Sequence, residues 1–215
     1  MSYSLSRTNM LKQQLRAGNV LNETILDVFN STPRELFVPA KFKPFAYCDT
    51  QIELAHDQRM MTPLEEGLLL QALELTGHEV VLEVGTGSGY LTTLLSKLCK
   101  QVISIDCYVE FTRTAQQRLN SLQIHNVEFI TDNACSGWHD KAPYDIIIFT
   151  GAIPTISDVL RLQLSSGGRL FAITGSSPSM QGILSHQVSP NSWQDTLLFE
   201  TDLPPLFGLD LNYLR

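Results

Sequence analysis

Apolar residues recur at helical spacing in the first part of the chain. Within residues 8–30 this spacing predicts two short helices, and Asn22 is placed to cap the second of them. Residues 43–61 show no period and are expected to form a long loop. A loop of that length in a compact domain is usually functional or mobile, so this segment is a candidate part of a site.

The clearest helix start lies in residues 62–75, which read TPLEEGLLLQALEL. Thr62 is a candidate N-cap, Pro63 suits the first helical position, and Glu65 stands three residues after the cap. Together these residues predict a capping box, in which the side chains of Thr62 and Glu65 each accept a hydrogen bond from the other residue's backbone N–H.

Beyond residue 78 the pattern changes to an alternation of strands and helices. The apolar runs of the strands are continuous, as expected for strands that are covered on both faces. Strands are expected at 79–84, 101–106, 126–131, 144–150 and 168–174, and helices at 88–98, 109–122 and 156–164. This alternation predicts an α/β fold with a doubly wound, mostly parallel sheet of the Rossmann-like type.

The last two apolar segments, 182–189 and 195–203, have no helix between them and predict an antiparallel pair of strands at the edge of the sheet. The whole chain, 1–215, is expected to form a single domain. In this interpretation residues 1–62 build an N-terminal helical cap and the long loop, and residues 63–215 build the core.

The composition of the chain indicates which kinds of binding partner and which location are expected. Hydrophobic residues make up 43% of the chain, which allows a sizeable core, and the net charge of -7 disfavours a protein that binds nucleic acid. No segment has the ~20 apolar residues of a membrane span, and the N-terminus lacks the apolar core of a signal peptide. The four cysteines include no C-x-x-C pair, so no metal is expected and a cytoplasmic location fits best.

Three glycines, Gly85, Gly87 and Gly89, follow one predicted strand and open a predicted helix. Such a turn lets the backbone approach a ligand and presents free N–H groups at the helix start. The dinucleotide fingerprint G-x-G-x-x-G would place a small residue at position 90, which here is Tyr90. Glu83 suits a cationic ligand such as S-adenosylmethionine (SAM) and would repel a pyrophosphate.

Two further acids stand at the ends of the next two predicted strands. Asp106 lies ~20 residues after the glycines, where a carboxylate accepts hydrogen bonds from both ribose hydroxyls. Asp132 is placed to accept a hydrogen bond from an adenine amino group. These strand ends predict a SAM site, and its candidate residues are Glu83, Gly85, Thr86, Gly87, Ser88, Gly89, Asp106, Cys107, Asp132 and Asn133.

Along nearly its whole length the chain resembles the protein-L-isoaspartate O-methyltransferases. The most specific stretches are PRELFVP (33–39) and YDIIIFTGAIP (144–154), whereas VLEVGTGSGY (81–90) is shared by many methyltransferases. ETDLPPLFG (200–208) looks like the family's closing motif. The resemblance implies methylation of an isoaspartyl carboxylate in damaged proteins or peptides, with S-adenosylhomocysteine (SAH) as product. It also implies a substrate cleft formed by the 43–63 loop and the C-terminal segment.

The chain departs from this family just before the third helix. These enzymes usually carry Thr-Ile-Ser there, and the serine helps to position the substrate carboxylate. Here the run is Arg59-Met60-Met61, and Thr62 stands one residue late. Arg59 is either an exposed loop residue or a replacement for the serine, because a guanidinium binds carboxylate through two parallel hydrogen bonds. The candidate acceptor-site residues are Arg59, Met61 and Thr62.

Several alternatives remain open on the sequence. Met60 and Met61 either pack under the helix that follows or line an apolar acceptor pocket. His56 and Asp57 are either solvated or supply a general base for a hydroxyl or amine acceptor. The other functions considered are a SAM methyltransferase for a different small or apolar acceptor, a SAM-binding protein without turnover, and a nicotinamide-binding oxidoreductase. The sequence does not indicate an oligomeric state.

Overall fold

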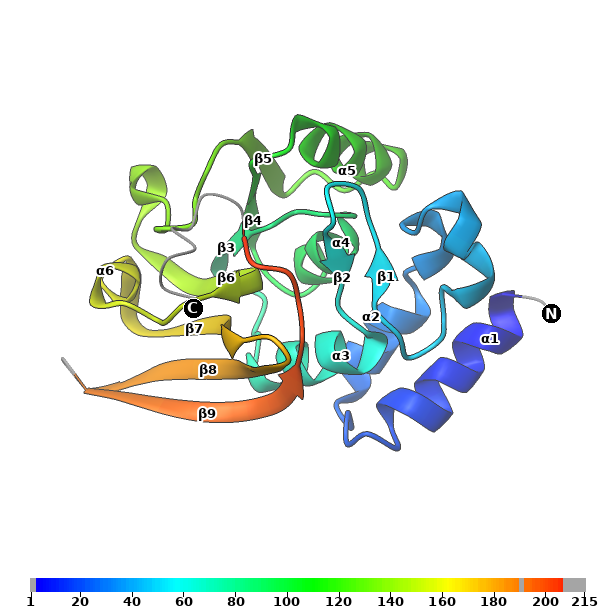
Figure 1. Cartoon of the computed structure of the whole chain (residues 1–215), viewed down its shortest axis with the longest axis horizontal. Helices are drawn as coiled ribbons and strands as arrows, with labels where there is room; N and C mark the ends of the chain where they lie inside the picture. The colour runs from blue at the N-terminus through cyan, green and yellow to red at the C-terminus, as the bar shows by residue number, and fades with distance from the viewer. Residues whose placement is uncertain (1–2, 190–191, 207–215) are drawn as a thin grey trace.

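A seven-stranded sheet forms the centre of the computed structural model, which describes residues 3–189 and 192–206 (Figure 1). The strand order is β5-β4-β3-β6-β7-β8-β9. β3 to β7 pair in parallel, and β8 and β9 add an antiparallel edge. The strands are β3 (Val80–Val84), β4 (Gln101–Asp106), β5 (Val127–Thr131), β6 (Tyr144–Ile153), β7 (Leu164–Ser176), β8 (Ser179–Ser189) and β9 (Ser192–Thr201). The predicted α/β fold and its antiparallel edge are confirmed.

Helices cover both faces of this sheet, while β8 and β9 extend at the end opposite the N-terminal helices (Figure 1). The helices are α1 (Tyr3–Asn9), α2 (Glu23–Asn30), α3 (Pro63–Ala72), α4 (Tyr90–Ser96), α5 (Val109–Ser121) and α6 (Asp158–Arg161), with a π-helical turn η1 (Met10–Leu15) and 3₁₀ turns η2 (Arg34–Leu36), η3 (Ala40–Phe45) and η4 (His139–Lys141).

The sheet divides the interior into two apolar layers. Because successive side chains of a strand point to opposite faces, Val81 and Ile146 join one layer and Leu82 and Ile147 join the other. The first layer also contains the buried residues of α2, α3 and α4, so the N-terminal segment packs into the same core as the sheet. This shared core holds the N-terminal segment against the strand ends.

The predicted helix signals in the first 75 residues are present in the structure. The Asn22 side chain accepts hydrogen bonds from the backbone N–H groups of Thr24 and Ile25 and so caps α2. At the start of α3 the Thr62 side chain accepts from the backbone N–H of Glu65, and the Glu65 carboxylate accepts from the backbone N–H of Thr62 at 2.7 Å. The capping box predicted from the sequence is therefore confirmed.

Two elements differ from the sequence-based prediction. Within the expected loop, β1 (Ile52–Glu53) and β2 (Arg59–Met60) form a short antiparallel hairpin. The helix expected at 156–164 is limited to α6, because Leu164 instead pairs with Tyr144 and begins β7. In both places the hydrogen-bonded pairing of strands outweighs the structure that the local sequence pattern predicts.

Candidate functional site

The glycine turn lies at the carboxyl end of β3, where the strand order of the sheet reverses. β4 and β5 lie on one side of β3, and β6 and β7 lie on the other. Ligands of open α/β sheets bind at such a switch point, outside the carboxyl ends of the strands. Gly85, Gly87 and Gly89 all have positive φ, at 100°, 50° and 79°. The turn therefore takes a backbone path that other residues rarely adopt.

The three glycines have different surroundings. A Cβ atom on Gly85 would lie 2.1 Å from Thr150 Oγ1, and one on Gly89 would lie 2.7 Å from the Cβ of Ala115. A Cβ on Gly87 would meet only Leu54, at 3.3 Å. Gly85 and Gly87 line the pocket beside the turn, whereas Gly89 allows α4 to approach α5 and lines neither wall of that pocket.

The pocket beside the turn has two adjoining parts. Both are lined by Leu54, Arg59, Gly85, Gly87 and Thr150. The first part runs along the ends of β4 and β5 and adds Asp106, Cys107, Tyr108, Phe111, Asp132, Asn133, Ala134 and Cys135. The second part lies between the turn and β2 and adds Met60, Met61, Glu66, Glu83, Thr86, Ser88 and Leu91. Every predicted donor-site residue except Gly89 thus lines one of the two parts.

Asp106 braces the turn at the end of β4. Its carboxylate accepts hydrogen bonds from the backbone N–H groups of Gly87 and Tyr108, both at 2.9 Å. Burial raises the pKa of the Asp106 carboxyl above its usual value, and these two donors partly offset that effect. An ionised Asp106 keeps acceptor capacity toward the pocket, because two carboxylate oxygens offer about four lone-pair directions.

The loop after β5 shapes the far end of the first part. Asp132 accepts a hydrogen bond from the N–H of Asn133 at 2.7 Å, and Asn133 accepts one from the N–H of Cys135 at 3.1 Å. These local hydrogen bonds hold the side chains in a compact turn. The backbone N–H of Asp132 in turn donates to the carbonyl of Asp106, which ties this loop to the end of β4.

Glu83 is fully buried at the end of β3. One of its oxygens accepts hydrogen bonds from Thr92 and Ser104, both at 2.6 Å, while the other is buried with no hydrogen-bond partner in the described residues. Burial raises the pKa of the Glu83 carboxyl to about 7, against the lowering effect of those two hydroxyls. Ser104 also bonds to Thr86 at 2.7 Å, so the acid and the turn share one polar network.

The β1–β2 hairpin forms the opposite wall. In its register Ile52 faces Met60 and Glu53 faces Arg59. Met60 is buried on one side of the hairpin, and Arg59 lies exposed on the other side and lines both parts of the pocket. Within the described residues the Arg59 side chain makes no hydrogen bond or ion pair, and the Glu53 carboxylate pairs with Lys41.

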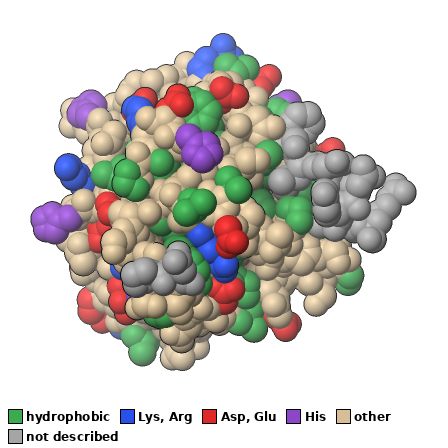
Figure 2. All heavy atoms as spheres, turned by 90° about the vertical axis from the view of Figure 1, so that its left-hand side faces the viewer, with side chains coloured by type: hydrophobic (Ala, Val, Ile, Leu, Met, Phe, Trp, Pro, Cys, Tyr) green, Lys and Arg blue, Asp and Glu red, His purple; other side chains and the backbone are tan. Residues whose placement is uncertain are grey.

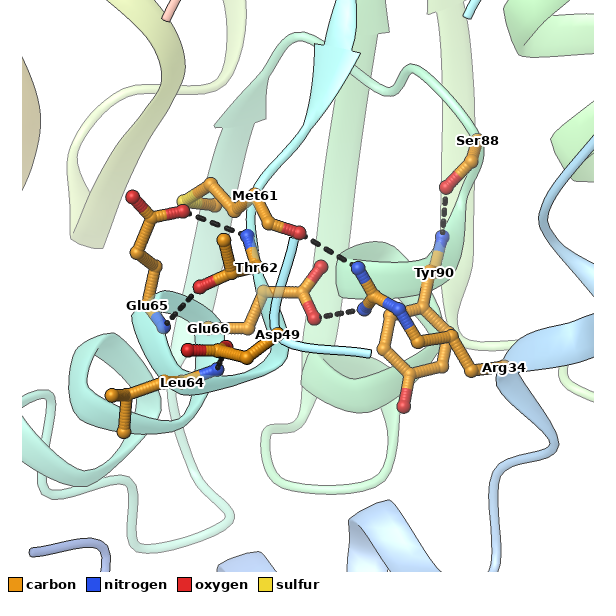
Figure 3. A network of polar contacts seen from close by, with 9 residues as sticks. All are labelled: Arg34, Asp49, Met61, Thr62, Leu64, Glu65, Glu66, Ser88 and Tyr90. Carbon is orange, nitrogen blue, oxygen red and sulfur yellow. Dashed lines mark hydrogen bonds and ion pairs between the residues drawn. The ribbon is translucent and has the colours of Figure 1, made fainter. Parts of the chain in front are cut away.

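Behind this wall lies a buried ion pair between Arg34 and Glu66 (Figure 3). Arg34 also donates to the carbonyl of Met61 at 2.7 Å, and its guanidinium lies 4.5 Å from the centre of the Tyr90 ring. Arg34 is 0% exposed and Glu66 is 2% exposed. The pair therefore joins the N-terminal segment, the end of the hairpin and α3 at the second part of the pocket.

The remaining acceptor candidates lie in different surroundings. Met61 is buried in the core and also lines the second part of the pocket. Thr62 lines neither part, because its side chain caps α3. His56 stacks on Tyr108 with ring centres 3.9 Å apart and its Nε2 lies 3.6 Å from the Glu110 carboxylate, so its ring packs outside the pocket lining. Asp57 lines neither part.

Sequence reasoning missed some residues of the site. Thr150 lies within β6 and donates to the carbonyl of Gly85 at 2.7 Å. It ends the strand predicted at 144–150, and a strand end is a signal that could have found it. Glu66 and Tyr108 gave no such signal, since their place in the pocket depends on the packing of α3 and of the hairpin. Of the expected closing motif, residues 207 and 208 lie outside the described residues, whereas Leu206 lines the first part.

Comparison with known proteins identifies the family. The profile described as protein-L-isoaspartate(D-aspartate) O-methyltransferase matches residues 5–191. The chain belongs to this family. A protein-L-isoaspartate O-methyltransferase of a Synechococcus strain is 37% identical over 180 residues, which are 84% of this chain and 74% of the relative. Another, from Desulfotalea psychrophila, is 33% identical over 210 residues, which are 98% of this chain and 95% of the relative.

Solved structures agree on the fold. A protein-L-isoaspartate O-methyltransferase superposes with a TM-score of 0.81 at 22% identity, over 94% of this chain and 66% of its own. A Plasmodium falciparum protein described as a putative member of the family, in complex with SAH, gives 0.75 at 17% identity, over 93% of this chain and 97% of its own. As a member of this family the chain is a SAM-dependent methyltransferase, as the sequence predicted.

The pocket fits the chemical groups of SAM. Asp106 presents to the pocket a carboxylate of the kind predicted to accept hydrogen bonds from ribose hydroxyls, and Gly87 leaves the backbone open to close approach. The unpartnered oxygen of Glu83 is suited to a cationic N–H donor. The residues that would hold the donor are therefore those at the ends of β3, β4 and β5, and their individual roles stay predictions.

Proposed function

We propose that this enzyme methylates the free carboxylate of L-isoaspartyl and D-aspartyl residues in proteins and peptides, and that Arg59 binds that carboxylate. The observation that carries the proposal is the guanidinium of Arg59, which lines both parts of the pocket and has no hydrogen bond or ion pair to any residue that the structure describes. Membership of the family supports the substrate class. Arg59 stands where the family's hydroxyl-bearing run would be, so it supplies the recognition that this run otherwise provides.

The chemistry needs positioning rather than proton transfer. SAM supplies an electrophilic methyl group on its sulfonium sulfur. In the reaction the S–CH₃ bond breaks, a carboxylate oxygen forms the new O–CH₃ bond, and SAH leaves as a neutral thioether. The acceptor carboxylate is already ionised at neutral pH, because its ordinary pKa is about 4. No general base is therefore required of His56 or Asp57.

Arg59 would act by holding the acceptor in line. A guanidinium donates two parallel hydrogen bonds to one carboxylate, which fixes both its position and its plane. Bringing the reactants into an attack geometry is worth several kcal/mol of the barrier, of the order of 7 or more when orientation is complete. The backbone of Arg59 is held in place on its C-terminal side. The next residue, Met60, is buried, and the helix α3 that follows has a capped start.

The test is a methylation assay with paired peptides. Purified enzyme is incubated with labelled SAM and an isoaspartyl peptide, beside the same peptide with a normal aspartyl residue, and base-labile methyl groups are counted. We expect label on the isoaspartyl peptide and at most background label on the aspartyl control. Absence of label on both, with SAH binding demonstrated in the same sample, would overturn the proposal and direct the search to a different acceptor.

The alternative acceptors have less support. Met60 and Met61 are only 5% and 4% exposed and belong to the core, as one of the two sequence-based interpretations expected. An apolar acceptor would need them to offer a larger surface to the pocket. A SAM-binding protein without turnover would not need an exposed Arg59 on the lining of the pocket. Formation of SAH with any acceptor would exclude this function.

We also propose that residues 1–215 act as one domain in the cytoplasm, with a protein or peptide as partner. One apolar cluster joins the N-terminal helices to the sheet, which supports a single unit. No helix in the described ranges is long and apolar enough to cross a membrane. On the face shown in Figure 2, the described Lys and Arg side chains are scattered among acidic ones and form no continuous basic surface, which supports a partner other than nucleic acid.

A further inference from the structure

Two buried carboxylates, Glu83 and Glu66, line the second part of the pocket from different elements. Glu83 is the last residue but one of β3, and Glu66 lies in the first turns of α3. The charge of Glu83 is among the groups that raise the pKa of Glu66. The two carboxylates therefore share one small pocket, and Glu66 lies within reach of the charge of Glu83.

Each of the two carboxylates uses only one of its oxygens for hydrogen bonds within the described residues. Glu83 uses one oxygen for Thr92 and Ser104 and leaves the other buried without a partner in the described residues. Glu66 uses one oxygen for Arg34, and within the described ranges its carboxylate makes no further hydrogen bond. In Figure 3 a dashed line joins only one of the two Glu66 oxygens to Arg34, and the other oxygen has no dashed line.

Arg34 alone does not balance the buried charge in this part of the pocket, and Arg59, which also lines it, is exposed to solvent. With both acids ionised, the buried groups Arg34, Glu66 and Glu83 carry one positive and two negative charges. Arg34 is already occupied by Glu66, by the Met61 carbonyl and by the Tyr90 ring. A buried unpaired carboxylate is costly, so this arrangement favours a bound cation that donates hydrogen bonds.

We propose that Glu66 is a second carboxylate ligand, beside Glu83, for the α-ammonium group of the donor's amino-acid moiety. An ammonium has three N–H donors, enough to serve the free oxygen of each acid. Glu66 would thereby link donor binding to Arg34 and to the hairpin carbonyl of Met61. The proposal rests on the SAM dependence of the proposed function and not on the identity of the acceptor.

The test compares two ligands and two variants by calorimetry. SAH carries the α-ammonium, and its desamino analogue keeps the carboxylate and adenosine but lacks the ammonium. In Glu66→Gln we expect SAH to bind roughly tenfold or more weakly than in the wild type, because a charge-assisted hydrogen bond is lost. The desamino analogue should bind within about twofold of its wild-type affinity, since it has no group for Glu66 to hold.

Glu65→Gln is the matched control. Glu65 adjoins Glu66 on the same helix turn and lines neither part of the pocket, and glutamine preserves a capping box. It should leave both affinities within about twofold of wild type. Equal losses of SAH and of the desamino analogue in Glu66→Gln, or no loss of either, would overturn the proposal and leave Glu66 as a structural partner of Arg34.

A second measurement uses the wild-type protein, in case Glu66→Gln does not fold. Burial raises the pKa of Glu66 to about 8, although Arg34 lowers it, so most of the population is protonated at neutral pH. An ammonium beside the carboxyl lowers its pKa, so SAH should release protons near pH 8, where Glu83 with a pKa of about 7 is already largely ionised. Few protons should be released near pH 9, where Glu66 is largely ionised as well. The charged or titratable groups around Glu66 are Arg34 of η2, Arg59 of β2, Glu65 of α3, Glu83 of β3 and Tyr90 of α4.

Calorimetry in buffers of different ionisation enthalpy measures this proton release. We expect release with SAH and clearly less with the desamino analogue at the same pH. Identical release with both ligands would overturn the proposal. Neither calorimetric experiment contains a methyl acceptor, so failure of the isoaspartyl assay and failure of this proposal are distinguished.

Discussion

The two walls of the pocket are built in different ways. The wall at the strand ends is formed by the glycine turn and by Asp106 and Glu83, whose carboxylates are held by backbone N–H groups and by buried hydroxyls. The hairpin wall is formed by two strands of two residues each, and its outward residue Arg59 has no ion pair within the described part of the chain.

Because the two walls are built differently, we expect one to bind the donor and the other to bind the acceptor. A donor with fixed groups benefits from a site whose polar atoms are already oriented, because no ordering is required on binding. The acceptor carboxylate is presented by many different damaged proteins. A long, flexible side chain such as arginine can adjust its position to bind each of them. We therefore expect substitutions in the strand-end wall to change donor affinity, and those in the hairpin to change acceptor turnover.

Gly85→Ala is one of two substitutions for which the largest effects are expected. A Cβ there would lie 2.1 Å from Thr150 Oγ1 at a φ of 100°, so overpacking and backbone strain add to about 3 kcal/mol. SAH affinity measured by calorimetry should fall roughly 100-fold. Gly77→Ala is the control, since Gly77 has a similar φ of 93° but no atom within 4 Å of the added Cβ. Equal SAH affinities in the two variants would contradict a turn shaped by close packing.

Arg59→Ala tests the other wall. Loss of one oriented donor at a reacting centre costs about 3 kcal/mol, so kcat/KM for an isoaspartyl peptide should fall roughly 100-fold. SAH affinity should stay within about twofold, because Arg59 is assigned to the acceptor. Arg113→Ala, an exposed arginine on α5 outside the pocket lining, is the control.

Two outcomes would break this assignment of Arg59. Unchanged turnover would show that the guanidinium does not hold the acceptor. A parallel loss of SAH affinity would place the guanidinium on the donor's own carboxylate and would merge the two walls into one donor site. Arg59→Lys should recover only part of the activity, since an ammonium keeps the charge but not the planar pair of donors.

A smaller effect is expected for His56→Ala, which tests how the hairpin is held over the strand ends. Its ring stacks on Tyr108 and meets Phe111 edge-on. An aromatic pair contributes about 0.5–1.5 kcal/mol, so SAH should dissociate roughly five times faster in a stopped-flow experiment. His125→Ala, which alters a histidine at a distant groove, should leave the rate unchanged. An unchanged rate in His56→Ala would mean that Ile52 and Met60 alone seat the hairpin.

The smallest effect is expected for Thr62→Ala, which separates the helix cap from the chemistry. Loss of the capping hydroxyl should lower the free energy of unfolding by about 1 kcal/mol, or the melting temperature by about 2–4 °C. Turnover of an isoaspartyl peptide below the melting range should be unchanged. Thr62→Ser, which keeps the hydroxyl, should melt near the wild-type temperature. A loss of turnover in Thr62→Ala that Thr62→Ser restores would make Thr62 part of the acceptor site.

The wall at the strand ends was predictable because its signals are local in sequence. Positive-φ glycines, an acid two residues before them and acids at the ends of consecutive strands occupy fixed places in the chain, and parallel pairing then brings those ends to one edge. The capping box at Thr62 is equally local, because it involves two residues within one helical turn. For the same reason the sequence could predict α5 and β4 almost to the residue.

Only the tertiary structure decided the other wall and its charge. The hairpin depends on the pairing of Ile52 with Met60 and on the stacking of His56 against a residue more than 50 positions away. The contact between Glu66 and Arg34 joins residues 32 positions apart, and helical spacing alone marked neither as part of a site. Burial then sets the protonation of Glu66 and Glu83, and burial is a property of the packed chain rather than of any segment. The sequence by itself determined the fold class and the residues at the strand ends, because their signals are short-range. The hairpin wall and the position of Glu66 beside the pocket depend on long-range packing.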